Sequence, residues 1–117
     1  MPDLLTNYLA CWNETDSAAR RELLRQHWAQ DATYTDPMVA VHGLDELDAT
    51  IAAVQAQFPG FVFSAAGPLD AHHDQARFTW NLGPADGDTV IVGSDVVIIN
   101  AESQIATVLG FLDRVPF

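Results

Sequence analysis

The sequence predicts an α+β fold in which three N-terminal helices pack on one side of a curved, mainly antiparallel sheet. Apolar residues recur every three or four positions as far as residue 58, as they do on one face of a helix. From Phe61 onwards the apolar period changes to two, which is typical of half-buried strands. Helices followed by a three- or four-strand meander indicate a sheet covered on one side. Because 117 residues can bury one core, we expect a single domain over residues 1–117.

Apolar stripes predict the first two helices. Leu4, Tyr8 and Trp12 lie at helical spacing in the first helix, so Tyr8 is expected to face the interior. Asp16 is a residue type that caps helices, and it precedes a second stripe of apolar residues. We expect this second helix to continue to about Gln30.

A short strand and the third helix follow. Residues 32–36 are rich in β-branched and aromatic types, and Pro37 stops the strand, so Asp36 is displayed at its end. The third helix is expected to begin after Gly43, with acidic residues in the first turn where the helix dipole favours them. Pro59 lies directly after its apolar stripe and ends it.

The remaining chain predicts strands. Residues 61–63 form the first, and the turn sequence at 83–87 joins a strand over 75–82 to a long apolar strand that starts near Thr89. A second turn leads into a last strand over residues 104 to about 112. The expected sheet therefore contains a hairpin whose second arm is the longest strand.

Three polar residues fall where the pattern predicts an apolar interior: Tyr8, Asp36 and Asp95. Asp95 lies in the middle of the long strand, where apolar neighbours would raise its pKa by desolvation. A buried acid costs free energy unless it has a partner, is protonated or is used. A salt bridge with Arg77 is the structural alternative, but strand alternation places Arg77 on the opposite face.

These three residues suit proton transfer next to a carbonyl group. Such a reaction needs a base within reach of the carbon and donors aimed at the oxygen where negative charge develops. Asp36 would be the base, and Tyr8 with a protonated Asp95 would be the donors. The structural alternatives are a core tyrosine for Tyr8 and a turn residue that accepts backbone hydrogen bonds for Asp36.

The expected ligand is a small apolar or aromatic molecule. The net charge of −11 repels nucleic acid and anionic membrane surfaces, and no apolar run is long enough to span a membrane. The sequence has no Gly-rich phosphate loop and no spaced set of metal ligands, so we expect no cofactor and no metal. Gly93 would leave room for a ring of the ligand beside Asp95. The other expected pocket walls are Trp12, Tyr34, Phe58, Phe63, Phe78, Trp80, Leu82, Val108 and Leu112.

The segments 8–13 and 31–37, within this order of helices and strands, resemble the NTF2-like superfamily, and specifically its SnoaL-like and ketosteroid isomerase-like members. The resemblance covers nearly the whole chain and implies a cystatin-like cone, with the sheet wrapped around an apolar pocket. It also implies that Asp36 is a base that moves a proton between carbons of a polycyclic ketone. Tyr8 and a neutral Asp95 would donate to the dienolate oxygen, as a neutral carboxyl does in the ketosteroid isomerases.

Two other functions fit the same residues. A hydrolase or dehydratase would use Asp36 and Asp95 as base and acid on water or a hydroxyl, with His73 added if its turn folds over the pocket mouth. A non-catalytic module would bind or carry an apolar molecule, and the substitution Asp36→Asn would then leave binding nearly unchanged.

The outer face of the long strand predicts self-association. Val90, Val92, Val96 and Ile98 alternate with the inward residues and are too apolar for solvent, so we expect a homodimer through this face. The N-terminal segment has no basic region before its apolar residues, which favours a cytoplasmic location.

Overall fold

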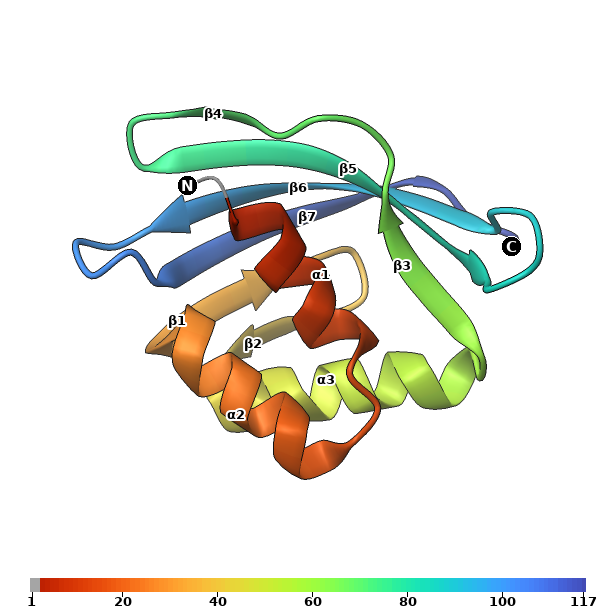
Figure 1. Cartoon of the computed structure of the whole chain (residues 1–117), viewed down its shortest axis with the longest axis horizontal. Coiled ribbons are helices and arrows are strands. Elements are labelled where there is room, and N and C mark those ends of the chain that lie inside the picture. Colours follow the sequence, from red (N-terminus) through yellow and green to blue (C-terminus); the bar gives the residue numbers. More distant parts are fainter. Residues whose placement is uncertain (1–2) are drawn as a thin grey trace.

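A computed structural model describes residues 3–117 and contains three helices on one side of a seven-stranded mixed sheet (Figure 1). The helices are α1 (Leu4–Asn13), α2 (Ser17–His27) and α3 (Leu44–Gln57). The strands are β1 (Trp28–Thr35), β2 (Ala40–His42), β3 (Phe61–Ala65), β4 (Asp70–His72), β5 (Gln75–Pro84), β6 (Ile91–Ile99) and β7 (Ile105–Arg114). The predicted α+β architecture is confirmed.

The sheet runs in the order β2-β1-β7-β6-β5-β3, and β4 pairs with β5 outside this path. All pairs are antiparallel except β1 with β7, which is parallel. The sheet is open, and it curves over the helices so that α1 lies beneath the long strands β5, β6 and β7 (Figure 1). The curvature leaves space between the sheet and α3, where the site described below is found.

The end of the second helix was predicted wrongly. Helix α2 begins as expected, with the Asp16 carboxylate accepting from the Ala19 N–H at 2.9 Å, but it ends at His27 rather than near Gln30. Trp28 already has extended backbone angles and begins β1, which reaches Thr35. The apolar residues after His27 fit either period, and pairing with β7 decides the conformation because it buries Trp28 completely.

The strand count was also underestimated. Strands β2 and β4 have three residues each and are largely exposed, so they carry no alternating pattern that a sequence would reveal. The parallel pairing of β1 with β7 joins segments about 75 positions apart and turns the expected meander into a mixed sheet.

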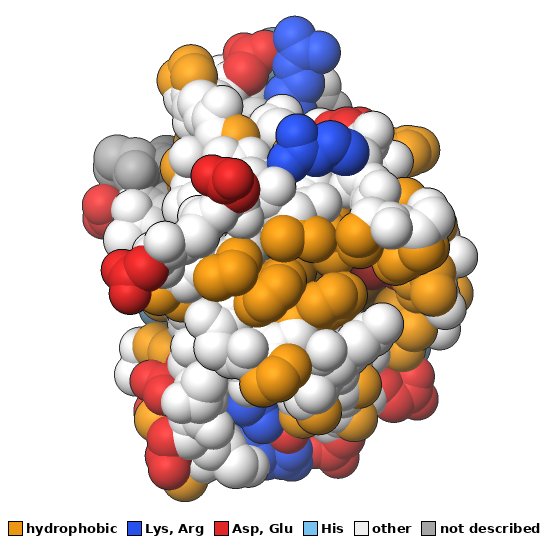
Figure 2. Space-filling model, turned by 90° about the vertical axis from the view of Figure 1, so that its right-hand side faces the viewer, with side chains coloured by type: hydrophobic (Ala, Val, Ile, Leu, Met, Phe, Trp, Pro, Cys, Tyr) orange, Lys and Arg blue, Asp and Glu red, His pale blue; other side chains and the backbone are white. Residues whose placement is uncertain are grey.

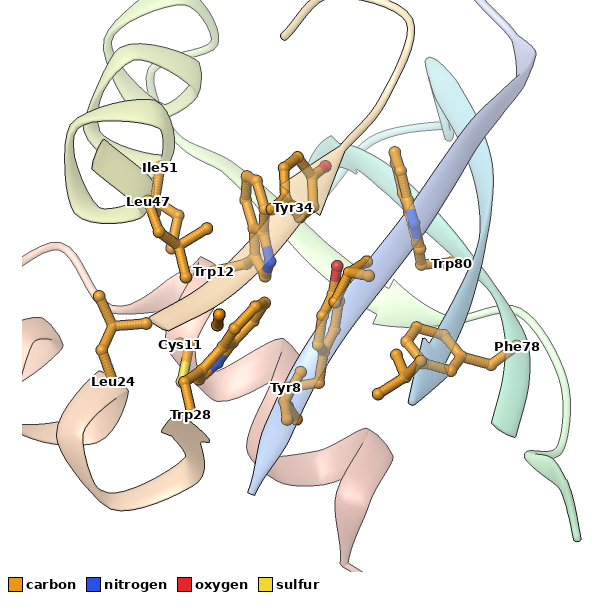
Figure 3. Close-up of a cluster of buried hydrophobic side chains, with 14 of the residues drawn as sticks. Tyr8, Cys11, Trp12, Leu24, Trp28, Tyr34, Leu47, Ile51, Phe78 and Trp80 are labelled. Carbon is orange, nitrogen blue, oxygen red and sulfur yellow. The ribbon is translucent and has the colours of Figure 1, made fainter. Parts of the chain in front are cut away.

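The core fills the space between the helices and the concave face of the sheet. Figure 3 shows Tyr8 between Trp28 and Phe78, and its ring centroid lies 5.8 Å from that of Trp28 and 5.0 Å from that of Phe78. Tyr8 is 2% exposed, so its predicted inward orientation is confirmed. These contacts fix α1 over β5 and β6 and thereby fix the position of the Tyr8 hydroxyl.

A buried ion pair, which the sequence pattern did not indicate, joins α2 to α3. The Arg20 Nε donates to Oδ1 of Asp48 at 2.6 Å, and both side chains are almost fully buried. The Arg20 guanidinium also donates to the Glu14 carbonyl and to Oε1 of Gln55, both at 3.1 Å. The pair is therefore part of a network that holds α3 beside α2. In residues 3–117, no helix is long and apolar enough to cross a membrane.

Candidate functional site

A cavity of about 500 Å³ opens between the sheet, α3 and the C-terminal residues. Its lining is mostly apolar, and the exposed hydrophobic residues Met38, Phe111 and Phe117 belong to it, so they lie at its opening. Figure 2 shows the side of the molecule on which the C-terminus lies, where hydrophobic side chains form a band across the middle. An apolar molecule would meet a matching surface at this entrance.

Most of the predicted wall residues line this cavity: Trp12, Tyr34, Phe58, Phe63, Trp80, Leu82 and Leu112. Phe78 and Val108 are not among the lining residues and belong to the core cluster. Gly93 does not line the cavity either. A Cβ at Gly93 would lie 2.1 Å from Cζ2 of Trp80, so the space that the sequence reserved for a ligand ring is filled by the chain's own indole.

The sequence reasoning missed the wall that α3 contributes. Glu46, Thr50, Ala53 and Gln57 recur at helical spacing and line the cavity beside the core stripe of the same helix. These positions are small or polar, whereas the pattern that predicts an interior face is formed by the large apolar residues of this helix. The helix has a second stripe, made of small and polar residues, beside its apolar stripe, and that second stripe could have predicted this wall.

Asp95 lies on β6 and is 2% exposed. The Tyr8 hydroxyl donates to its Oδ2 at 2.6 Å, and the Trp80 Nε1–H donates to the same oxygen at 3.1 Å. Burial raises the pKa of Asp95 from 3.8 to about 6, because desolvation outweighs the two donors, and nearby Asp36 and Asp113 add to the rise. The predicted desolvation of this carboxyl is confirmed. Burial, with Asp95 beside it, also raises the pKa of Tyr8 well above its ordinary value.

Asp36 directly follows β1 and is half-buried. The Tyr34 hydroxyl donates to its Oδ2 at 2.7 Å, while the backbone N–H groups of Met38 and Val39 donate to Oδ1 at 2.8 and 3.1 Å. Pro37 and this turn lead into β2, so strand pairing and local hydrogen bonds together fix the carboxylate. Burial raises the pKa of Tyr34, and the neighbouring Asp95 and Asp36 raise it further.

The structure brings Tyr8, Asp36 and Asp95 to one wall of the cavity. Asp95 is the cross-strand neighbour of Gly110. A Cβ at Gly110 would lie 2.8 Å from Oδ1 of Asp95 and 3.2 Å from Cβ of Asp36, so only a residue without a side chain lets the two acids approach this closely. One half-buried carboxyl and one buried carboxyl that can hold a proton near pH 6 therefore face a common, mainly apolar space.

Other candidates lie elsewhere. Arg77 bonds Asp70 at 2.9 Å on the exposed side of β5, as strand alternation predicted, and does not pair with Asp95. His73 is exposed in the turn after β4, where its Nδ1 lies 3.0 Å from that of His72, and it does not line the cavity. Within the described residues, no group of three histidine, cysteine or acidic side chains is placed to hold a metal ion.

A family model described as the SnoaL-like domain matches residues 5–107. A solved structure of a proposed isomerase of the SnoaL-like family from Agrobacterium tumefaciens is 43% identical, covers 96% of each chain and superposes with a TM-score of 0.91. A proposed SnoaL-like polyketide cyclase from Jannaschia has the same fold, with 16% identity, coverage of 96% of this chain and 86% of that one, and a TM-score of 0.73. No curated protein sequence matches the chain.

Proposed function

The chain belongs to the SnoaL-like family of the NTF2-like superfamily, and we propose that it catalyses proton transfer, as an isomerase or a cyclase does, on an apolar polycyclic ketone. The observation that carries this proposal is the pair of acids beside Gly110, one of them bonded to Tyr8, on one wall of an otherwise apolar cavity. The similarity to a proposed isomerase at 43% identity supports the reaction class.

In the proposed reaction Asp36 removes a proton from the carbon next to the carbonyl. The electrons of the broken C–H bond form a carbon–carbon double bond, and the carbonyl π electrons move to oxygen, which becomes negatively charged. Protonated Asp95 donates to this oxygen, and the Tyr8 hydroxyl, which donates to Oδ2 of Asp95, strengthens that donor. In a ketone with a second C=C bond at the β,γ position the anion is a dienolate, and Asp36 returns the same proton to its γ carbon while the C=O bond forms again. No proton is gained or lost, and the C=C bond has moved into conjugation.

The cavity supports an uncharged, ring-shaped substrate. Trp12 and Trp80, which are buried, and Phe63, which is partly buried, present flat apolar surfaces to the space. A net charge of −11 would disfavour an anionic substrate in a site that already contains two carboxyl groups.

The test is the absorbance change as a Δ5-3-ketosteroid becomes its conjugated isomer. We expect turnover by the wild type, a loss of about 10²–10⁴-fold in kcat for Asp36→Asn, and a loss of about 10²-fold for Asp95→Ala. Asp31→Asn is the matched control, because Asp31 is exposed on the same strand and outside the cavity, and it should keep full activity. An inactive wild type would reject a steroid substrate, and an active Asp36→Asn would reject Asp36 as the base.

One observation favours a second candidate, a module that binds an apolar molecule without reaction. The Asp36 carboxylate already accepts three hydrogen bonds from Tyr34, Met38 and Val39, which is what a purely structural turn residue does. Under this function Asp36→Asn would leave the affinity for an apolar ligand unchanged, and no substrate would be converted.

A further inference from the structure

The two oxygens of the Asp95 carboxyl have different surroundings. Oδ2 accepts two hydrogen bonds, from the Tyr8 hydroxyl and from the Trp80 indole. Oδ1 has no hydrogen-bond partner within residues 3–117, and it lies 2.8 Å from the ideal position of a Cβ at Gly110, closer than a side chain there would allow. The carboxyl is therefore held at one oxygen and free at the other.

Two further residues, Gly93 and Phe63, hold the Trp80 indole where its N–H can reach Asp95. An ideal Cβ at Gly93 would come within 2.1 Å, 2.5 Å and 2.7 Å of three indole atoms of Trp80, so the indole can lie across β6 only where no side chain is present. The Phe63 ring packs edge-on against the indole, with 5.2 Å between the ring centroids. The Trp80 N–H thus reaches Asp95 from a ring that its neighbours fix in place.

We propose that Trp80 is a positioning residue of the site: with Tyr8 it keeps Oδ2 of Asp95 as an acceptor, so that the proton of the neutral carboxyl sits on Oδ1. A carboxyl oxygen whose two lone pairs already accept an N–H and an O–H has no lone pair left to bind the proton. The proton then lies on the oxygen that is nearer to Gly110 and Asp36, and both acids line the cavity. This role rests on the proposed function, in which Asp95 donates to the oxygen of the substrate.

The arrangement explains how the donor and the base serve the same part of one molecule. In proton transfer next to a carbonyl, the carbon that loses its proton is bonded to the carbon that bears the oxygen. Base and donor must therefore be close together, with nothing between them. Asp36 and Oδ1 of Asp95 both border the position that a Gly110 side chain would occupy. If Oδ1 accepted from Trp80 and Oδ2 carried the proton, the donor would point back towards Tyr8 instead.

The test uses the free protein and needs no substrate. In ¹⁵N-labelled protein the indole N–H signals are assigned with Trp12→Phe and Trp28→Phe, and the Asp95 carboxyl carbon is followed by ¹³C labelling across the pH range. We expect the Trp80 signal to shift with the same midpoint as the Asp95 carbon, near pH 6. The Trp28 signal, whose N–H is buried without a partner among the described residues, should not follow it. Asp95→Asn should abolish the shift of the Trp80 signal.

The variant Trp80→Phe removes the donor and keeps a ring in place. It should raise the Asp95 midpoint by about one pH unit, because the charged carboxylate loses a hydrogen bond. Phe61→Leu removes a ring at a site that packs on Phe58 outside the cavity, and it should leave the midpoint where it is. The other titratable groups that act on Asp95 are Tyr8 on α1, Tyr34 on β1 and Asp36 after β1, together with Asp113 on β7 through its charge, and they are the same in both variants.

The proposal would be overturned if the Trp80 indole N–H signal does not shift as Asp95 titrates. It would also be overturned if Trp80→Phe leaves the Asp95 midpoint unchanged. If Trp80→Phe does not fold, the proposal is tested by the pH dependence of the Trp80 indole N–H signal in the wild type alone. The proposed reaction can fail separately: coupled titration in a protein that converts no ketone would support the role of Trp80 and reject the reaction.

Discussion

At the scale of single residues, the burial of Asp95 raises its pKa and thereby lowers the stability of the folded protein at neutral pH. Its pKa is raised from 3.8 to about 6, so the unfolded chain loses this proton at a lower pH than the folded protein does. Stability from this group is complete below about pH 4 and is lost as the pH rises through 6. A shift of this size corresponds to about 2–3 kcal/mol at neutral pH.

The variant Asp95→Asn keeps an acceptor for Tyr8 and Trp80 but cannot ionise. We therefore expect it to unfold at higher urea concentration than the wild type above pH 6, with a gain of about 2–3 kcal/mol, and to match the wild type near pH 4. Urea titrations at both pH values measure this difference, with Asp31→Asn as the exposed control. A variant that is less stable than the wild type at pH 8 would contradict the cost assigned to Asp95.

The residues of the site differ in how well the sequence could reveal them. Asp95 was evident because an acid in the middle of an apolar strand needs an explanation, and Asp36 was evident from its place before a proline. The bond from Trp80 to Asp95 could not be predicted, because it depends on the register that puts Trp80 opposite Gly93. The same register explains why Gly93 accommodates an indole of the chain and not a ligand ring.

At the scale of elements, the sequence predicted those that have a strong period and missed those that depend on pairing. Helices α1 and α3 and strands β5, β6 and β7 carry unambiguous patterns. The segment 28–30 could have ended a helix or begun a strand, and only the partner strand β7 decides between them. Strands β2 and β4 are too short and too exposed to leave a pattern.

The ion pair of Arg20 with Asp48 gives a prediction for α2 and α3. Replacing Arg20 by Met leaves the buried Asp48 carboxylate with only the more distant Arg21, at 3.2 Å, so we expect a loss of about 3 kcal/mol in the free energy of unfolding. Arg77→Met is the control, because its pair with Asp70 is exposed and should contribute less than about 1 kcal/mol. Equal urea midpoints for the two variants would show that the buried network does not stabilise the helix pair.

At the scale of the whole molecule, polar and apolar surfaces serve different purposes. The net charge of −11 makes most of the charged surface acidic, while the cavity is mostly apolar and the outer face of β6 and β7 exposes Ile98 and Leu109. The three helices cover the concave face of the sheet, and no element of the described chain covers the opposite face in Figure 1. Val90, which the sequence analysis assigned to that outer face, precedes β6 and packs against the core instead.

The outer face supports the proposal of a dimer formed by two copies of this chain. Val96 of β6 lies opposite Leu109 of β7, and Ile98 and Leu109 are 37% and 42% exposed. A patch of this kind can pair with itself across a two-fold axis, and a stable dimer buries about 800 Å² on each partner. Because the patch is apolar, the acidic charges elsewhere on the two copies can stay in solvent.

Sedimentation should therefore give twice the mass of the chain at micromolar concentration. Leu109→Glu should shift the protein to monomers, because a carboxylate opposite its own copy at the two-fold axis would be desolvated and repelled. Ala101→Glu adds the same charge in an exposed turn and should leave the dimer intact. A monomeric wild type would reject the dimer and leave the apolar face to another partner. The cavity lies on the helix side of the sheet, so a monomeric Leu109→Glu should still bind an apolar ligand there.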